Sequence, residues 1–345
     1  MVPWSQGGGA QGALVQILRQ LPRERVIVVI LFGGNRNHDA IQQNAGRVIE
    51  FDEPRTPAGI WRARRRLRPL VESAHVVYSL MRGSHLVLGM LPARTLRSID
   101  LVTTFHQLPS QDASGTQGRV EDAFVRRAVG HSALVTAPAA SAVTELKVGK
   151  YAPTERIVLE PNGIAVGSHD APEARAGELD ELRLVFAGRL SEQKGLDRTP
   201  ELLNASDIPI RLRIIGDGEE RELVDGLAAQ ISDLHHVEVI GHTDAIVEHL
   251  DWSDAVFLPS RWELNPLIIW EARARGRGTI ASDIRPLLDL ASSGPMWFFD
   301  SPDGFASIVQ RLVSHEAVRA TAHTDAIASA SLLEGTSRIV EHLTR

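Results

Sequence analysis

The chain contains no cysteine, and this absence removes three kinds of chemistry. The protein can form no disulfide, can offer no thiolate to a zinc ion and has no cysteine nucleophile. The sequence also lacks an apolar run of about 18 residues, and its first residues show no basic start followed by an apolar stretch. We therefore expect a cytoplasmic protein without a membrane-spanning segment.

Charge of one sign is not in large excess either. The formal net charge is −6 over 345 residues, with 23% charged and 43% hydrophobic residues. This balance does not favour nucleic acid as a partner, because binding to its phosphates depends on clustered Lys and Arg. A chain of this length exceeds one typical core, so we expect two domains.

Short β-branched runs alternate with longer amphipathic stretches, which predicts parallel sheets with crossover helices, and hence an α/β fold of two doubly wound domains. We expect an N-terminal domain at 1–165, a linker at 166–181, a C-terminal domain at 182–325 and a final helix at 326–345 that packs back on the N-terminal domain. The predicted strands are 26–31, 47–49, 76–79, 101–104, 133–136, 157–159, 182–187, 211–215, 237–240, 255–258, 279–281 and 297–299.

The N-terminus departs from this pattern. A glycine-rich segment at 7–12 opens a predicted helix, yet only six residues precede it. A first strand of normal length is therefore missing. Either that strand is reduced to the first few residues, or the chain starts late, and the sequence leaves both alternatives open.

Two cations follow the predicted strand 182–187. Arg189 and Lys194 lie in the sequence Gly-Arg-Leu-Ser-Glu-Gln-Lys-Gly and thus at the carboxyl end of the strand. In an open parallel sheet this edge faces the ligand, where Arg offers a fork of donors to phosphate and Lys a mobile point charge. The pair matches the two charges of a diphosphate. The alternative is a solvated loop with surface cations.

Two carboxylates follow the predicted strand 255–258. The sequence predicts Asn265 as a helix N-cap and Pro266 as the first helical residue, with Glu263 in the preceding loop and Glu271 in the second turn. Unpaired N–H groups at such a start attract phosphate or hydroxyl oxygens, and an ionised Glu accepts hydrogen bonds from two neighbouring sugar hydroxyls. The alternative is that Glu271 is a solvent-facing helix residue.

A glycosidase pair is a rival interpretation of the same carboxylates. On one helix, eight residues would separate the backbones of Glu263 and Glu271 by roughly 12 Å. Retaining hydrolases need carboxyl groups roughly 5 Å apart. The spacing disfavours hydrolysis without excluding it.

The order of these motifs resembles glycosyltransferase family 4 over most of the chain. The motifs are Gly188-Arg189 with Lys194-Gly195, Gly-Asp-Gly at 216–218, Leu-Pro-Ser at 258–260 and the segment 263–271. The resemblance implies the GT-B architecture of two Rossmann-like lobes that face a cleft. It also implies transfer of a sugar from a nucleotide-diphosphate donor, with retained anomeric configuration and without a metal or other cofactor.

The resemblance assigns roles to the four charged residues. Arg189 and Lys194 would contact the donor diphosphate, Glu271 the ribose hydroxyls and Glu263 the transferred sugar. With His106, three of these residues, Arg189, Lys194 and Glu263, form the expected catalytic set. The implied mechanism is attack on one face of the sugar, in which the leaving diphosphate helps to deprotonate the acceptor.

Further donor contacts follow from the resemblance. Backbone N–H groups of Asn265, Leu267 and Ile268 would lie near the sugar and phosphate. His242 and Thr243, which follow the predicted strand 237–240, would border the base. The expected donor is a nucleotide-diphosphate sugar, most simply a UDP-sugar, and the acceptor is unknown: a small molecule, a glycan or a lipid-linked compound.

The N-terminal half would complete the donor site. Gly8 and Gly9 are similar to the family's Gly-Gly-Ala-Glu helix start, where backbone approaches the diphosphate, but Gln11 replaces the acid. His106, after the predicted strand 101–104, looks like the family's His near the donor sugar. For His106, the alternative is a structural role. For the glycine-rich segment, the alternative is a dinucleotide fingerprint, which the missing strand and the glycine spacing disfavour.

The basic segment 61–68, Trp-Arg-Ala-Arg-Arg-Arg-Leu-Arg, is interpreted as a solvated helix face. Contact with a membrane surface is possible but not favoured, because no strong apolar face accompanies the charges. Two other functions stay open beside the transferase. They are a catalytically weak accessory subunit that binds nucleotide-sugar, and a sugar-nucleotide epimerase of similar architecture.

Overall fold

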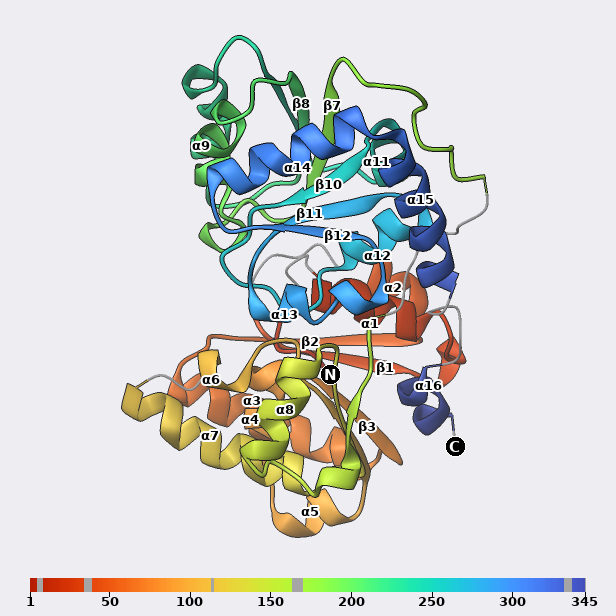
Figure 1. The fold of residues 1–345 in the computed structure, drawn as a ribbon. Helices are drawn as coiled ribbons and strands as arrows, with labels where there is room; N and C mark the ends of the chain where they lie inside the picture. Colours follow the sequence, from red (N-terminus) through yellow and green to blue (C-terminus); the bar gives the residue numbers. More distant parts are fainter. Residues whose placement is uncertain (5–8, 34–38, 113–114, 163–169, 332–336, 345) are drawn as a thin grey trace. The chain divides into compact units, whose positions relative to one another are not determined.

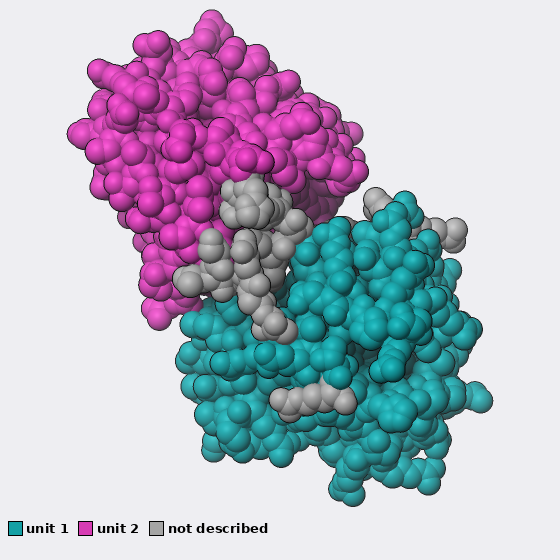
Figure 2. All heavy atoms as spheres, turned by 90° about the vertical axis from the view of Figure 1, so that its right-hand side faces the viewer, with its two compact units in different colours: residues 1–163, 336–345 teal, residues 164–335 magenta. Residues whose placement is uncertain are grey.

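The computed structural model describes residues 1–4, 9–33, 39–112, 115–162, 170–331 and 337–344. The chain divides into two compact units, which Figure 2 shows in different colours. Unit 1 contains residues 1–163 and 336–345, and unit 2 contains residues 164–335. Within the described residues, no helix has the length and apolar character needed to cross a bilayer.

Unit 1 is an α/β unit whose strands all pair in parallel. Its strands are β1 Ile27–Phe32, β2 Arg47–Glu53, β3 Val76–Leu80, β4 Asp100–Thr104, β5 Leu134–Ala137 and β6 Ile157–Leu159. Its helices are α1 Gly9–Leu18, α2 Asp39–Asn44, α3 Pro57–Glu72, α4 Met81–Gly89, α5 Ala93–Arg97, α6 Pro109–Asp112, α7 Gly115–Gly130, α8 Ala140–Val148 and α16 Arg338–Leu343, with 3-10 turns η1 Arg23–Arg25 and η2 Thr154–Arg156.

The first three residues take the place of the missing strand. β1 pairs with β2, β3 pairs with β4, and β5 and β6 follow. Val2 N donates to Val29 O at 3.0 Å on the β1 side, and Leu80 N donates to Met1 O at 3.0 Å on the β3 side. With residues 1–3 counted as the first strand, the strands follow the order 3-2-1-4-5-6-7, which is the Rossmann order with one further strand at its end.

The last helix of the chain packs on unit 1. Ile339 and Val340 of α16 are buried in a cluster with Ile17 and Val102. The neighbouring α15 ends in unit 2 at residue 331. Residues 332–336 lie outside the described residues. Helix α16 has only six residues, too few for a stable isolated helix, so the packing of its apolar side on unit 1 stabilises it.

Unit 2 repeats the doubly wound α/β plan. Its strands are β7 Leu182–Ala187, β8 Ile210–Ile215, β9 His236–Gly241, β10 Ala255–Leu258, β11 Gly278–Ser282 and β12 Met296–Phe299. Its helices are α9 Thr199–Asn204, α10 Arg221–Asp225, α11 Ile246–Trp252, α12 Leu267–Ala274, α13 Arg285–Leu288, α14 Pro302–Ser314 and α15 Glu316–Ser331, with 3-10 turns η3 Glu192–Lys194, η4 Leu196–Arg198, η5 Leu227–Gln230 and η6 Ala291–Ser293.

The sheet of unit 2 runs β12-β11-β10-β7-β8-β9, all in parallel. Helix α14 lies across the sheet and contacts β7 and β12 (Figure 1). Phe305 of α14 packs edge-on against Phe257 and Phe299 of the sheet, with ring centroids 5.5 Å apart in both pairs. The strand order reverses between β7 and β10, and ligands of such sheets bind beyond the carboxyl ends of the strands at this point.

The predicted α/β fold with two Rossmann-like domains is confirmed. Each predicted strand is present, and most bounds differ by one residue or none. The largest difference is β2, which runs to Glu53 rather than ending at residue 49. Its sequence Arg-Val-Ile-Glu-Phe-Asp-Glu alternates polar and apolar residues only in part, so the pattern marks the start of the strand better than its end.

Candidate functional site in the C-terminal unit

Two loops meet at the carboxyl edge of the unit 2 sheet. One follows β7 from Gly188, and the other follows β10 from Pro259. At Gly195 φ is +64°, and a Cβ there would lie 2.3 Å from Pro259 O. Glycine is therefore required at this position both for the backbone conformation and for the contact between the two loops.

Ion pairs and hydrogen bonds fasten the same loops. Arg261 donates to both carboxylate oxygens of Asp197, at 2.6 Å each, and its N–H donates to Gln193 O at 2.8 Å. Hydrogen bonding to Arg261 lowers the pKa of Asp197. Arg198 donates to Pro259 O at 3.3 Å. The loop after β7 is thereby held in place against the loop after β10.

The structure brings Lys194 and Glu263 into direct contact. Lys194 Nζ donates to Glu263 Oε1, which also accepts a hydrogen bond from Ser260 Oγ at 3.1 Å. Glu263 is 7% exposed. Its Oε2 has no partner among the described residues, so the carboxylate is fixed in orientation while one oxygen stays available to a ligand.

Arg189 contrasts with Lys194. It is exposed, and no hydrogen-bond or ion-pair partner occurs for it within the part of the chain that the structure describes. A guanidinium at the strand's carboxyl end with all its donors free is suited to a phosphate, which it can bind with two parallel hydrogen bonds.

The start of α12 differs from the prediction. The helix begins at Leu267 after Pro266, and no side chain caps it. Asn265 is not the N-cap: its Oδ1 accepts a hydrogen bond from Trp270 Nε1 at 2.5 Å. The buried indole N–H needs an acceptor, and Asn265 supplies it. The N–H groups of Leu267 and Ile268, at the first helical turn, have no acceptor among the described residues and can bind a ligand oxygen.

Glu271 lies in the second turn of α12 and is half-buried. Within the described ranges its carboxylate has no hydrogen-bond or ion-pair partner. Burial raises its pKa above the ordinary value. A half-buried carboxylate without a partner is costly in the free protein, and such groups gather at binding sites.

His242 and Thr243 follow β9, at the same edge of the sheet. His242 is exposed, whereas Thr243 is half-buried and its Oγ1 accepts a hydrogen bond from Ala245 N at 3.1 Å. The structure thus places both residues on the carboxyl side of the sheet, two strands away from β7.

In unit 1, Gly8 lies outside the described residues, and Gly9 is the first residue of α1. A Cβ at Gly9 would meet nothing within 4 Å in the structure. Gln11, which replaces the family's acid, donates to Trp4 O at 2.9 Å.

His106 follows β4 and is half-buried. Its Nε2 has no hydrogen-bond partner within the described residues. Burial lowers the pKa of His106 to about 4, so the imidazole is neutral at neutral pH and can donate to or accept from a hydroxyl.

Comparison with known proteins identifies the family. The model for glycosyl transferases group 1 matches residues 170–327, and the model for the glycosyl transferase 4-like domain matches residues 8–163. The chain belongs to the glycosyltransferase family that these two models describe. An uncharacterized glycosyltransferase of Methanocaldococcus jannaschii is 28% identical over 144 residues, 39% of this chain and 36% of that protein, and another of Haemophilus influenzae is 28% identical over 118 residues, 33% of each. The chain thus spans about a third of the length of the curated relatives that it matches.

Solved structures show the same fold. A crystal structure of Anabaena HepE in complex with UDP and glucose superimposes with a TM-score of 0.76 at 19% identity, over 96% of this chain and 94% of that one. WaaG, a glycosyltransferase involved in lipopolysaccharide biosynthesis, gives a TM-score of 0.70 at 15% identity, over 96% and 94%. The chain therefore has the GT-B fold that these structures share.

Two groups of this glycosyltransferase's polar residues were not assigned from the sequence. Ser260, which the sequence shows only as part of a Leu-Pro-Ser motif, is completely buried and orients Glu263. His85 of α4 contacts Ser79 Oγ through Nδ1 at 2.9 Å and Thr104 O through Nε2 at 3.2 Å. No spacing signal could find these pairs, because each depends on how two elements pack.

The basic segment 61–68 of the glycosyltransferase lies on α3. Arg62 and Arg66 pair with Glu53, at 2.7 and 3.5 Å. Arg65 lies over the ring of Trp61, which is 48% exposed. Carboxylates therefore compensate part of the charge, in keeping with a solvated helix face.

Proposed function

We propose that the chain is a retaining glycosyltransferase that moves a sugar from a nucleotide-diphosphate donor to an acceptor hydroxyl without a bound metal. One observation carries the proposal. The carboxyl edge of the unit 2 sheet gathers a free guanidinium at Arg189, free N–H groups at the start of α12 and a carboxylate without a partner at Glu271, all at the point where the strand order reverses.

Each group suits one part of the donor. Arg189 and the N–H groups of Leu267 and Ile268 would bind the diphosphate, and Glu271 would accept hydrogen bonds from the ribose hydroxyls. Glu263, held by Lys194 and Ser260, would present Oε2 to the transferred sugar. Lys194, which pairs with Glu263, would also place its positive charge near the diphosphate. HepE with UDP or UDP-glucose supports a UDP-sugar as the donor.

The proposed reaction balances without a protein nucleophile. The bond between the anomeric carbon and the diphosphate oxygen breaks, and its electron pair leaves with the phosphate. The acceptor oxygen attacks the same face of the sugar and forms the new glycosidic bond, while its proton passes to the departing phosphate. Arg189 and the start of α12 stabilise the negative charge that develops on that phosphate.

Metal independence rests on the same cationic groups, which can neutralise the leaving diphosphate. Among the described residues, no three His, Asp or Glu side chains come together in a way that could hold a metal ion. His106 of unit 1 is proposed as a hydrogen-bond partner of the donor sugar, because its neutral imidazole has a free Nε2.

Donor hydrolysis tests the proposal although the acceptor is unknown. The purified chain is screened with UDP-, GDP-, ADP- and dTDP-sugars by thermal shift, and the sugar released from the stabilising donor is followed by proton NMR. We expect the sugar to be released first as the anomer found in the donor, at a rate that EDTA does not change. Release of the opposite anomer would contradict retention, and loss of activity in EDTA would contradict metal independence. Conversion of the intact donor into its epimer would show an epimerase instead.

A further inference from the structure

The opposite edge of the unit 2 sheet holds a pocket that the proposed donor site does not use. Its volume is about 280 Å³, part of which is open solvent. Asp254 directly precedes β10 and Arg277 directly precedes β11, so this is the amino edge of the strands. Its lining includes Arg175, Asp254, Arg277, Arg319 and Ala322. We call it the arginine pocket.

The carboxylates near the arginine pocket are already paired. Arg175 donates to both oxygens of Asp254, Nε to Oδ1 at 2.8 Å and Nη2 to Oδ2 at 2.5 Å. Asp251 is held by Arg275 in the same bidentate way, at 2.7 and 2.8 Å. Within the described residues, neither Asp254 nor Asp251 therefore forms an ion pair with Arg277 or Arg319.

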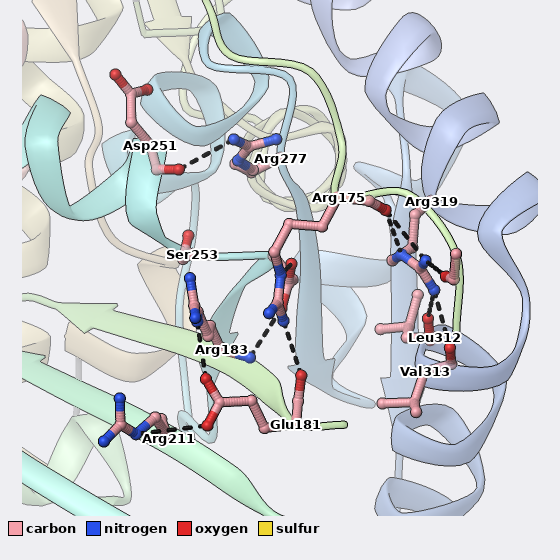
Figure 3. A network of polar contacts seen from close by, with 12 residues as sticks. Arg175, Glu181, Arg183, Arg211, Asp251, Ser253, Arg277, Leu312, Val313 and Arg319 are labelled. Carbon is pink, nitrogen blue, oxygen red and sulfur yellow. Dashed lines mark hydrogen bonds and ion pairs between the residues drawn. The ribbon is translucent and has the colours of Figure 1, made fainter. Parts of the chain in front are cut away.

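Arg319 is buried among carbonyl groups. It is 5% exposed, and Figure 3 shows its guanidinium directed at the main chain of Arg175 and of α14; Arg175 belongs to the segment 170–181 before β7, which we call the connector. Its acceptors are the carbonyl oxygens of Arg175, Gly177, Leu312 and Val313. Its donors are thus satisfied, but its full positive charge has no carboxylate partner in the described chain.

Arg277 also lacks a carboxylate partner, and it has donors to spare. It is 4% exposed, and its Nε donates to Leu250 O at 3.2 Å. Its Nη2 donates to Asp251 O at 3.1 Å (Figure 3). The Nη1 groups of Arg277 and Arg175 have no acceptor among the described residues. Burial lowers the pKa of both Arg277 and Arg319, although the charge of Asp254 acts on both in the opposite direction.

We propose that the arginine pocket binds a small inorganic anion, phosphate or chloride, between Arg277 and Arg175. The lining holds three arginines and one aspartate, a formal excess of two positive charges. The anion would accept hydrogen bonds from both Nη1 groups and offset the charge of Arg319. Because Arg175 belongs to the connector, the bound anion would fasten the connector to β11 and α15.

Thermal unfolding of the full chain tests this inference. Sodium gluconate, whose anion is too bulky for the pocket, is replaced stepwise by sodium chloride or sodium phosphate at constant ionic strength. Above the dissociation constant we expect the unfolding temperature to rise by about 2–4 °C for each tenfold increase in the bound anion. A rise with both anions indicates a general small-anion site, and a rise with phosphate alone indicates an oxyanion site. No rise with either would overturn the proposal.

Variants separate this pocket from the donor site, which also attracts phosphate. Arg277→Gln should lose the rise, whereas Arg189→Ala, at the other edge of the sheet, should keep it. The reverse pattern would place the anion in the donor site and refute the inference.

A second variant covers the case in which Arg277→Gln fails to fold. Ala322 lines the pocket from α15, and Ala322→Glu introduces a fixed carboxylate there. We expect this variant to unfold at a higher temperature than the unmodified chain in gluconate and to gain nothing from chloride or phosphate. An undiminished response to the anions would contradict the inference.

Discussion

Charged side chains at the two edges of the unit 2 sheet differ in burial and in hydrogen-bond partners. At the amino edge, Arg319 and Arg275 are buried and donate to backbone carbonyl groups or a carboxylate. At the carboxyl edge, Arg189 is exposed and Glu271 half-buried, and neither has a partner among the described residues. Arg319 and Arg275 thereby stabilise the fold, whereas Arg189 and Glu271 leave interactions to be completed by a ligand.

Replacing Arg189 should give the largest effect on turnover. Arg189→Ala removes a free cation from the leaving diphosphate, and we expect kcat to fall by about 10²–10³-fold. The free energy of unfolding should change by less than about 0.5 kcal/mol, because the side chain has no partner to lose. Steady-state kinetics and urea unfolding measure both quantities.

Arg211→Ala is the matched control for this change. Arg211 is a half-exposed arginine of the same sheet, near the amino edge, where it pairs with Glu181 at 3.5 Å. Its kcat should match that of the unmodified chain. Equal losses in the two variants would show that the carboxyl edge has no special role.

Replacing Arg319 should give the largest effect on stability. Arg319→Met keeps much of the side-chain volume but leaves the buried carbonyl groups of the connector and α14 without donors, at a cost of about 3 kcal/mol. Unfolding in urea measures this loss. The dissociation constant for the donor should stay within about twofold of normal, since no group of the donor site is touched. A variant of normal stability would contradict the structural role of the amino edge.

Glu271→Gln should give a smaller effect, on donor binding. We expect the donor dissociation constant to rise about tenfold, because an amide offers one accepting oxygen and no charge where a carboxylate offers two oxygens and a negative charge. Calorimetric titration with the donor or its nucleotide diphosphate measures the change. An unchanged constant would remove Glu271 from the ribose site.

The pH dependence of stability gives a further readout at Glu271. Burial raises the pKa of this carboxyl in the folded state, so the native protein binds more protons than the unfolded chain above the ordinary glutamate pKa. Stability should therefore fall as pH rises from the ordinary value through the folded-state pKa. Glu271→Gln should lack this contribution, and urea unfolding between pH 4 and 7 compares the two proteins.

Much of the carboxyl edge could be predicted because its residues follow strands. β7 and β10 are apolar runs, Leu-Arg-Leu-Val-Phe-Ala and Ala-Val-Phe-Leu, and parallel strands place the residues after them at one edge. The cluster of arginines at the amino edge could not be predicted from the sequence. Arg175, Arg277 and Arg319 are far apart in the chain and belong to no motif, and the sequence pattern of a buried arginine does not differ from that of a surface one.

Periodicity and turn chemistry in the sequence determined the α/β class, the strand runs and the positions of Arg189, Lys194, Glu263 and Glu271 at strand ends. These features depend on short stretches of chain, where side-chain pattern and backbone geometry are directly linked. Only the tertiary structure decided which groups are satisfied. Lys194 contacts Glu263, 69 residues further along the chain. Asn265 accepts a hydrogen bond from Trp270 instead of capping α12, and residues 1–3 lie between β1 and β3. Such contacts depend on the packing of whole elements, which places donors and acceptors that no local pattern connects.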